Sequence, residues 1–215
     1  MVQKEERRAR GRPRSFDPGE ALDRARAVFW NQGYAATSLD DLARATGLNR
    51  PSLYAAFGDK HALYLAALGR ARDEALAALA GGLERPGPLR PLLSGLFERA
   101  GAIYRAGDLG QRGCFIIGTA VTQALDDPEA RALTAGFVGE TDRLFRERFA
   151  RSAGELAAGL TPEAAAPLAS ATLHTLAIRA RAGAGEAEMT AVGQAAVAAL
   201  CGEATAKVVP STPPL

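Results

Sequence analysis

The sequence predicts an all-α protein of about nine helices: an N-terminal three-helix domain followed by a larger helical domain. Apolar residues recur at spacings of three, four and seven along most of the chain, which is the period of a helix. Glycine or proline stands between these stretches, and no alternating pattern of useful length predicts a strand. With 215 residues, 47% of them hydrophobic and 23% charged, the composition is that of a folded globular protein.

The first helix is expected over residues 17–32. Asp17 is a candidate cap, and Pro18 fits the first turn, where a missing N–H costs nothing. The stripe that faces the core consists of Leu22, Ala25 and Phe29. Trp30 is a candidate for packing this helix beneath the two short helices that follow.

Residues 38–60 contain two short helices joined by a glycine turn. Thr37 or Ser38 can accept hydrogen bonds at the start of the first helix. Gly47 stands where a helix ends in a left-handed conformation, and Asn49 can cap the second helix. Two compact helices joined in this way form the unit that places one helix in the major groove of DNA.

The second short helix is expected to have an outward face. Leu53 and Phe57 lie four residues apart and can pack inward. The side chains left free to point outward are Arg50, Ser52, Tyr54 and Ala55. Lys60 follows at the start of the next helix, where its charge opposes the helix dipole unless a phosphate lies nearby.

A longer helix over residues 59–80 is expected to end at Gly81-Gly82 and to link the two domains. Further helices are expected at 89–106, 113–125, 128–151, 162–182 and 186–201, with Pro86-Gly87-Pro88 as the clearest break. The expected division is a disordered basic arm at 1–16, a helix-turn-helix domain at 17–60, a helical effector-binding and dimerisation domain at 61–204, and a disordered tail at 205–215.

Positive charge is concentrated in the arm. The net charge of the chain is +2, yet residues 1–14 hold six basic and two acidic side chains. The segment Arg10-Gly11-Arg12-Pro13-Arg14 resembles the core of an AT-hook, which enters a narrow minor groove. We therefore expect these arginines to contact DNA; the alternative is a solvated tail.

Over residues 17–68 the chain resembles the DNA-binding domain of the TetR family of transcriptional repressors. The matching positions, at fixed spacing without gaps, are Ala27-Val28-Phe29, Gly33 to Ser38, Leu42-Ala43, Gly47-Leu48, Ser52-Leu53-Tyr54, Phe57, Lys60 and Leu63. In one departure, Ala55-Ala56 precede the phenylalanine, where family members often carry Tyr or His.

The resemblance implies a DNA-binding transcriptional regulator with a recognition helix that carries Arg50, Ser52 and Tyr54, and with Lys60 on a phosphate. Together with the arm and the caps, the expected DNA contacts are Arg10, Arg12, Arg14, Thr37, Ser38, Asn49, Arg50, Ser52, Tyr54 and Lys60.

The last two expected helices, near 162–182 and 186–201, are rich in alanine, and small residues let helices approach closely. The resemblance implies that they pair with those of a second copy in a four-helix bundle. Such a homodimer would present two recognition helices about 34–36 Å apart, or a multiple of that, to a near-palindromic site on double-stranded DNA. Packing within one chain is the alternative.

The middle of the second domain is expected to hold a pocket for an unknown small-molecule effector that releases the repressor from its operator. Such pockets are mostly apolar, with a few polar groups. The candidate effector-binding residues are Phe97, Tyr104, Cys114, Phe115, Thr119, Phe137 and His174. Each aromatic residue has plain core packing as its alternative, and His174 could be a hydrogen-bonded interior or interface histidine.

Cys114 follows Gly113 at an expected helix start and adjoins Arg112, an environment that lowers a thiol pKa. An alternative function is therefore a regulator that senses electrophiles or oxidants through Cys114. The other interpretation is a small buried hydrophobic residue.

The chain holds two histidines and two cysteines and lacks the common catalytic, metal-binding and phosphate-binding motifs. We therefore expect no enzyme, cofactor or metal, with a helical hydrolase built on Cys114 and His174 as the remaining alternative. No apolar run approaches about 18 residues, and the charged N-terminus lacks a secretory signal. These features favour a cytoplasmic protein without a membrane span.

Overall fold

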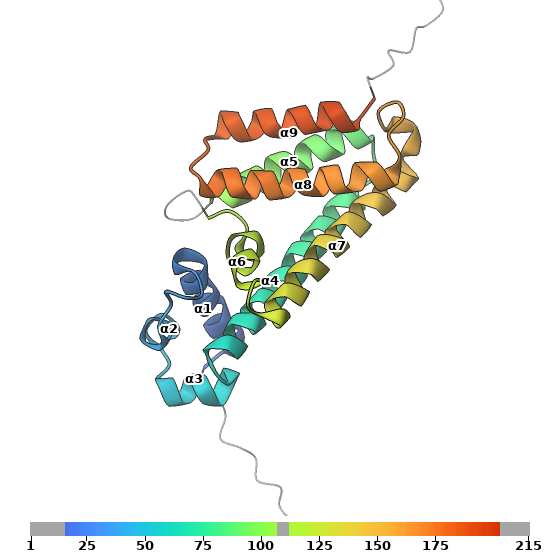
Figure 1. Ribbon diagram of the computed structural model, residues 1–215. Helices are drawn as coiled ribbons and strands as arrows, with labels where there is room; N and C mark the ends of the chain where they lie inside the picture. Colours follow the sequence, from blue (N-terminus) through green and yellow to red (C-terminus); the bar gives the residue numbers. More distant parts are fainter. Residues whose placement is uncertain (1–15, 107–111, 203–215) are drawn as a thin grey trace, which may run out of the picture.

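The computed structural model describes residues 16–106 and 112–202. Within these ranges the chain forms nine α-helices, one π-helical segment and one 3₁₀ turn, with no strand, which confirms the all-α prediction (Figure 1). The elements are α1 (Pro18–Gln32), α2 (Leu39–Thr46), α3 (Arg50–Phe57), α4 (Lys60–Leu83), α5 (Leu89–Arg105), η1 (Ile116–Ala120), α6 (Val121–Gln123), α7 (Pro128–Arg151), η2 (Ala153–Glu155), α8 (Pro162–Arg181) and α9 (Glu186–Leu200).

Helices α1, α2 and α3 form a small bundle at one end of the molecule (Figure 1). Helix α4 leads away from this bundle and runs beside α7, while α5, α8 and α9 form a layer at the other end. None of the described helices combines the length and the apolarity that a bilayer crossing needs.

Two expected helix boundaries were wrong. Helix α4 continues through Gly81 and Gly82 to Leu83, because neither glycine takes a positive φ that would end it. The helix expected from residue 113 does not begin there, because Gly113 has a φ of 65°, outside the range of a right-handed helix. The π-helical η1 and the short α6 follow instead.

An aromatic core supports the N-terminal bundle. Phe29 of α1 is fully buried, and its ring lies 5.1 Å from that of Tyr64 on α4 in an edge-to-face arrangement. Tyr34 stacks on Phe29 and lies tilted against Tyr64, and Phe115 meets Tyr64 in an edge-to-face arrangement. This core joins helices on both sides of residue 60, the expected domain boundary, so movements of α4 or of the segment at Phe115 can reach α1 by direct contact.

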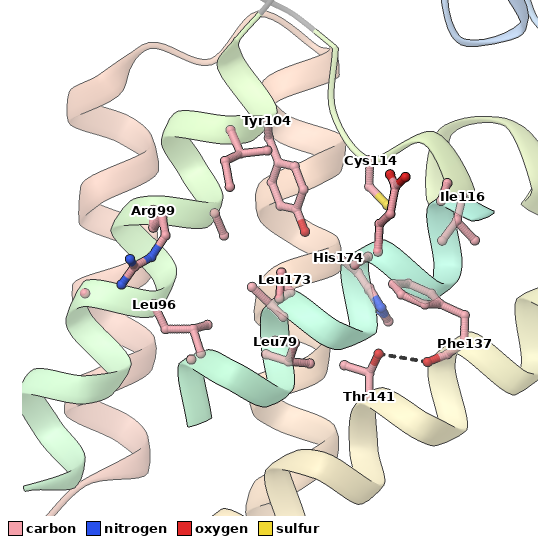
Figure 2. Close-up of a pocket in the computed structure, with 18 of the residues that line it drawn as sticks. Leu79, Leu96, Arg99, Tyr104, Cys114, Ile116, Phe137, Thr141, Leu173 and His174 are labelled. Atoms are coloured by element: carbon pink, nitrogen blue, oxygen red, sulfur yellow. Dashed lines mark hydrogen bonds between the residues drawn. The ribbon is translucent and has the colours of Figure 1, made fainter. Parts of the chain in front are cut away.

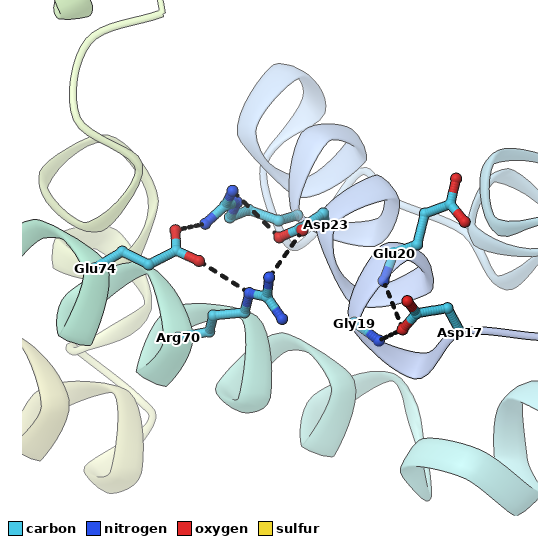
Figure 3. Close-up of polar contacts among 7 residues, drawn as sticks. Asp17, Gly19, Glu20, Asp23, Arg70 and Glu74 are labelled. Carbon is cyan, nitrogen blue, oxygen red and sulfur yellow. Dashed lines mark hydrogen bonds and ion pairs between the residues drawn. The ribbon is translucent and has the colours of Figure 1, made fainter.

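Charged side chains add a second connection between α1 and α4 (Figure 3). Arg26 of α1 donates to Glu74 of α4 at 2.5 Å. Arg70 donates to the same carboxylate at 2.9 Å and to Asp23 of α1 at 3.0 Å. All four side chains are partly exposed, and exposed ion pairs contribute little to the stability of a protein. We therefore expect this network mainly to align α1 with α4.

Trp30 does not pack beneath α2 and α3, which corrects the expectation from sequence. Its indole N–H donates to the carbonyl of Arg112 at 2.7 Å, and its ring lies 5.6 Å from that of Phe115. Arg181 of α8 donates to the Trp30 carbonyl at 2.9 Å. One residue corresponds to about 100° around a helix, so Trp30 faces α8 and the loop before η1 while Phe29 faces the bundle core.

Candidate nucleic-acid interface and effector cavity

Local hydrogen bonds fix the corner between α2 and α3. The hydroxyl of Ser38 accepts from the Asp41 N–H at 3.1 Å, and the Asp41 carboxylate accepts from the Ser38 N–H at 3.1 Å, which forms a capping box. Gly47 ends α2 in the left-handed conformation, with a φ of 72°. Asn49 caps α3 by accepting from the Ser52 N–H at 2.9 Å. The pair is therefore held rigidly before any ligand arrives.

Helix α3 lies at the outer end of the molecule (Figure 1). Leu53 is buried beneath it, and Phe57 is half-buried. On its outer side, Tyr54 is 48% exposed. An aromatic side chain exposed to this extent is a candidate for contact with a partner. Arg50 is also exposed, and Ser52 is half-buried. An exposed short helix with aromatic, cationic and hydroxyl groups suits insertion into a DNA groove.

Arg50 is paired with a carboxylate of α2. Its Nη2 lies 2.6 Å from Oδ2 of Asp40, and its Nε lies 2.9 Å from Oδ1, a two-pronged contact. The hydrogen bonds from Arg50 lower the pKa of Asp40 below its usual value. Sequence reasoning did not anticipate this pair, because the two residues lie on different helices.

Lys60 begins α4 directly after Asp59, which caps the helix by accepting from the Ala62 N–H. The ammonium group lies 4.5 Å from the centroid of the Tyr34 ring, a cation–π distance. The lysine is thus held at the start of α4, the helix that directly follows α3 in the chain.

The remaining expected DNA contacts fall into three groups. Arg10, Arg12 and Arg14 lie outside the described residues. Ser38 and Asn49 are exposed, with their side chains engaged as caps. Thr37 is a correction: it is buried, and its hydroxyl donates to the Gly33 carbonyl at 2.7 Å, so its side chain is not available to DNA.

A cavity of about 600 Å³ lies between α1 and the helices that follow α3 (Figure 2). Helices α4, α5, α7 and α8 form most of its wall, and the loop before η1 closes one side. Helix α1 also contributes, through Arg26 and Trp30. Of the expected effector residues, those that line this cavity are Tyr104, Cys114, Phe115, Phe137 and His174.

Phe97 and Thr119 do not line this cavity, which corrects their assignment. Phe97 is buried on the opposite side of α5 and borders a separate space of about 190 Å³ against α9. The hydroxyl of Thr119 donates to the Phe115 carbonyl at 2.8 Å and accepts from Tyr64 at 3.1 Å, within the aromatic core. Both are core residues.

Sequence reasoning missed much of the cavity wall, although α5 carried a signal. One stripe of this helix packs in the core and consists of Leu89, Leu93, Phe97 and Gly101. A second stripe, also at helical spacing, lines the cavity and consists of Leu92, Leu96, Arg99 and Ile103. Three of these four residues are apolar, and a second mainly apolar stripe on one helix indicates a second partner, which in this structure is the cavity.

Cys114 does not have the expected reactive environment. It is 9% exposed, and burial raises the pKa of its thiol instead of lowering it. Burial also lowers the pKa of His174, and Nε2 of this residue has no hydrogen-bond partner among the described residues. Both shifts favour the neutral groups over a thiolate–imidazolium pair, so the two residues lack the arrangement of an activated nucleophile.

One polar contact that the sequence did not indicate joins α4 to α7. Nε2 of His61 lies 2.7 Å from Oδ2 of Asp127, and Glu129 approaches the other ring nitrogen at 3.9 Å. The ligand atoms of these three residues lie within 4.8 Å of one another. Asp127 is already engaged as the N-cap of α7, where it accepts from the N–H groups of Glu129 and Ala130. The contact is therefore explained without a metal ion.

Comparison with known proteins agrees with this geometry. Residues 21–67 match the family model for bacterial regulatory proteins of the tetR family. The HTH-type transcriptional repressor ComR of Escherichia coli (strain K12) is 51% identical over 67 residues, which are 31% of this chain and 32% of ComR. The HTH-type transcriptional repressor BdcR of the same organism is 30% identical over 151 residues, which are 70% of this chain and 75% of BdcR.

Among solved structures, the TetR family transcriptional regulator CifR was captured as a cysteine mutant complexed with a 26-bp double-strand operator DNA. It is 33% identical to this chain, with a TM-score of 0.76, and the match covers 88% of this chain and all of the CifR chain. The likeness therefore extends through the helices that line the cavity as well as through α1, α2 and α3. The chain belongs to the TetR family of bacterial regulatory proteins and is a DNA-binding transcriptional regulator.

Proposed function

We propose that this protein is a homodimeric repressor that a small molecule releases from a near-palindromic operator. The observation that carries the proposal is the position of α1. This helix packs against α2 and α4, the two helices that hold α3, and Phe29 belongs to the buried cluster that includes Leu53 of α3. The next residue, Trp30, forms part of the cavity wall. A molecule in the cavity would therefore touch the same helix that positions the recognition helix.

On the DNA side, α3 would enter the major groove, with Arg50 at a base edge and Tyr54 at a phosphate or sugar. Lys60 would contact a phosphate, and the cap residues Ser38 and Asn49 would lie close to the backbone. The arm with Arg10, Arg12 and Arg14 would extend the contact into a minor groove. The operator complex of CifR supports this mode of binding.

Dimerisation through α8 and α9 is supported by the exposed face of α8. Leu168 is 52% exposed and Ile178 is 59% exposed, and the alanine-rich helix around them allows close approach of a partner. A second copy packed on this face would bury both side chains and present two α3 helices to the two halves of an operator.

In the mechanism that we propose, the dimer alternates between two spacings of its DNA-binding ends. An effector shifts this equilibrium only by the difference between its affinities for the two states. Contact with Trp30, together with the network of Arg26, Glu74 and Arg70 between α1 and α4, provides such a difference, because these groups join the cavity wall to the bundle.

The test is DNA binding as a function of salt, measured by gel shift on an operator selected from random DNA. Lys60→Ala is expected to weaken binding about tenfold to every sequence and to reduce the slope of log K against log salt by about 1, because one phosphate contact is lost. Tyr54→Ala is expected to behave similarly. Arg50→Ala should instead relax base preference at one position, by about 1 to 3 kcal/mol.

Arg151→Ala serves as the charge-matched control, because this exposed arginine ends α7 far from α3 (Figure 1). It should leave both the affinity and the salt slope unchanged. Unaltered binding in all three α3 and α4 variants would refute the assignment of the DNA interface.

Asp40→Asn is expected to tighten binding to non-operator DNA several-fold at low salt. The substitution removes a negative charge beside α3 and releases Arg50 from its two-pronged contact. The measurement is fluorescence anisotropy with a random-sequence duplex, with Asp73→Asn on the exposed part of α4 as the control for charge alone. Weaker binding by the Asp40 variant would mean that the pair serves to orient Arg50 toward DNA.

The alternatives receive less support. Sensing of electrophiles by Cys114 would require a thiolate, which burial disfavours. The burial that keeps the Cys114 thiol protonated also argues against a hydrolase that uses it as a nucleophile, and we propose no catalytic activity. Action on chromosomal DNA would place the protein in the cytoplasm.

A further inference from the structure

We infer that the cavity selects an uncharged lipophilic alcohol or phenol, and that His174 and Tyr104 bind its hydroxyl group. The inference deepens the proposed function, and it depends on that function only for its regulatory consequence. Binding in the cavity can be measured without DNA.

Most of the described residues that line the cavity are apolar, and the charged ones are Arg26, Glu74, Arg85 and Arg99. The uncharged polar side chains in its wall include Tyr104 from α5, Cys114 from the loop before η1, Thr141 from α7 and His174 from α8 (Figure 2). Burial raises the pKa of Tyr104 and of Cys114, and burial lowers the pKa of His174 despite the opposing charge of Asp142 nearby. These groups are neutral near pH 7, and an ionised ligand placed among them would lose its hydration without gaining a counter-ion.

The charged residues of the wall are engaged or peripheral. Glu74 already accepts hydrogen bonds from Arg26 and Arg70. Arg85 and Arg99 are exposed, and Figure 2 shows Arg99 on α5 at the side of the cavity away from Phe137. A charge contacted only at such a solvated edge contributes little to selection.

His174 supplies the observation that points to a ligand. Its Nε2 is buried without a hydrogen-bond partner among the described residues, whereas buried polar atoms in folded proteins are nearly always paired. The ring lies 6.3 Å from that of Phe137 in the apolar wall, and the nearby carboxylate of Asp142 acts on the imidazole through its charge but forms no hydrogen bond with it. A ligand group that reaches this imidazole would satisfy a polar atom that the described part of the chain leaves unpaired.

A hydroxyl group is the best match for these two residues. The imidazole of a neutral histidine donates from one nitrogen and accepts at the other, and a phenolic hydroxyl can do both. An alcohol or phenol also donates and accepts, so it can bond His174 in either tautomer and can bond Tyr104 as donor or acceptor. An ether or ketone can only accept, and a hydrocarbon can do neither.

Three probes with the same apolar body test this inference: 4-hexylphenol, 4-hexylanisole and 4-hexylbenzoate. Trp30 is the single tryptophan of the chain and lines the cavity, so its fluorescence reports occupancy, and calorimetry gives the affinity. We expect 4-hexylphenol to bind at least tenfold more tightly than 4-hexylbenzoate and about fivefold more tightly than 4-hexylanisole.

Variants assign the preference to residues. His174→Phe and Tyr104→Phe are each expected to abolish the advantage of the phenol over the anisole while changing the anisole affinity less than twofold. His174→Asn retains a neutral hydrogen-bonding group and should retain most of the preference. Thermal unfolding of each variant, together with its unchanged anisole affinity, distinguishes lost recognition from lost folding.

Other results would overturn the inference. Binding of the benzoate at least as tightly as the phenol, with loss of that binding in Arg99→Ala, would identify an anion site at the rim. An unchanged preference for the phenol in His174→Phe and Tyr104→Phe, or no binding of any probe, would equally reject it. Release of DNA by 4-hexylphenol is a separate measurement, so a failure of the proposed function would leave the binding result standing.

Discussion

Gly113→Ala is expected to lower the free energy of unfolding by about 3 kcal/mol or more, because it combines backbone strain with a steric clash. Gly113 has a φ of 65°, a left-handed conformation that costs other residues about 1 to 2 kcal/mol. A Cβ atom at this position would lie 2.7 Å from the carbonyl oxygen of Ala177 in α8. That oxygen belongs to a helix backbone and cannot move aside without disturbing α8.

The position also matters for the contact between the two ends of the molecule. The Gly113 N–H donates to the Tyr104 carbonyl at 2.9 Å, which ties the loop to α5. The carbonyl of the preceding Arg112 accepts from the indole of Trp30 at 2.7 Å. A displaced loop would weaken both bonds, so the variant should also respond less to any effector that acts through Trp30.

Urea unfolding followed by circular dichroism measures the effect, and two other glycines separate its causes. Gly159 has a φ of 78°, but no atom lies within 4 Å of the place that an added methyl group would occupy, so Gly159→Ala should show the strain alone. Gly69 lies within α4 with open space around it, and Gly69→Ala should stabilise the protein by up to about 1 kcal/mol. If Gly113→Ala lowers the free energy of unfolding no more than Gly159→Ala does, the close approach between residue 113 and the Ala177 carbonyl of α8 is contradicted.

The helix starts were predictable because their signals are local. Asp17 and Asn49 each cap the helix that the sequence assigned to them, Asp59 caps α4, and Pro18 and Pro128 occupy the first turns of α1 and α7. A cap depends on a side chain and on backbone N–H groups two or three residues away, so a linear sequence contains all of its parts.

The cavity was less predictable, since its wall comes from five helices that are distant in sequence. Periodicity reveals that α5 has apolar stripes but not which stripe meets α9 and which meets a void, and Phe97 was misplaced for this reason. The pKa of Cys114 was misjudged similarly: a nearby helix start and Arg112 favoured a thiolate, but burial, which depends on the whole fold, raised the pKa.

Phe29→Ala is expected to cost about 3 to 5 kcal/mol of the free energy of unfolding, the typical loss for a fully buried phenylalanine. No part of Phe29 is exposed, and its ring contacts both Tyr34 and Tyr64. Loss of the ring leaves a void between α1 and α4 that these rigid aromatic neighbours cannot fill. Denaturant unfolding monitored by circular dichroism tests the loss, with Phe29→Leu, which retains most of the volume, as the milder comparison.

The same substitution should separate the two halves of the mechanism. Because Phe29 supports the bundle and not the cavity wall, Phe29→Ala should weaken DNA binding through a misplaced α3 while the affinity of the cavity for 4-hexylphenol changes little at temperatures where the variant remains folded. Tyr64→Phe provides the matched control, since it removes only the hydroxyl that donates to Thr119 and preserves the packing. Equal losses of DNA and probe binding in Phe29→Ala would mean that the aromatic core stabilises the whole chain as one unit, and α1 would then transmit no separate signal.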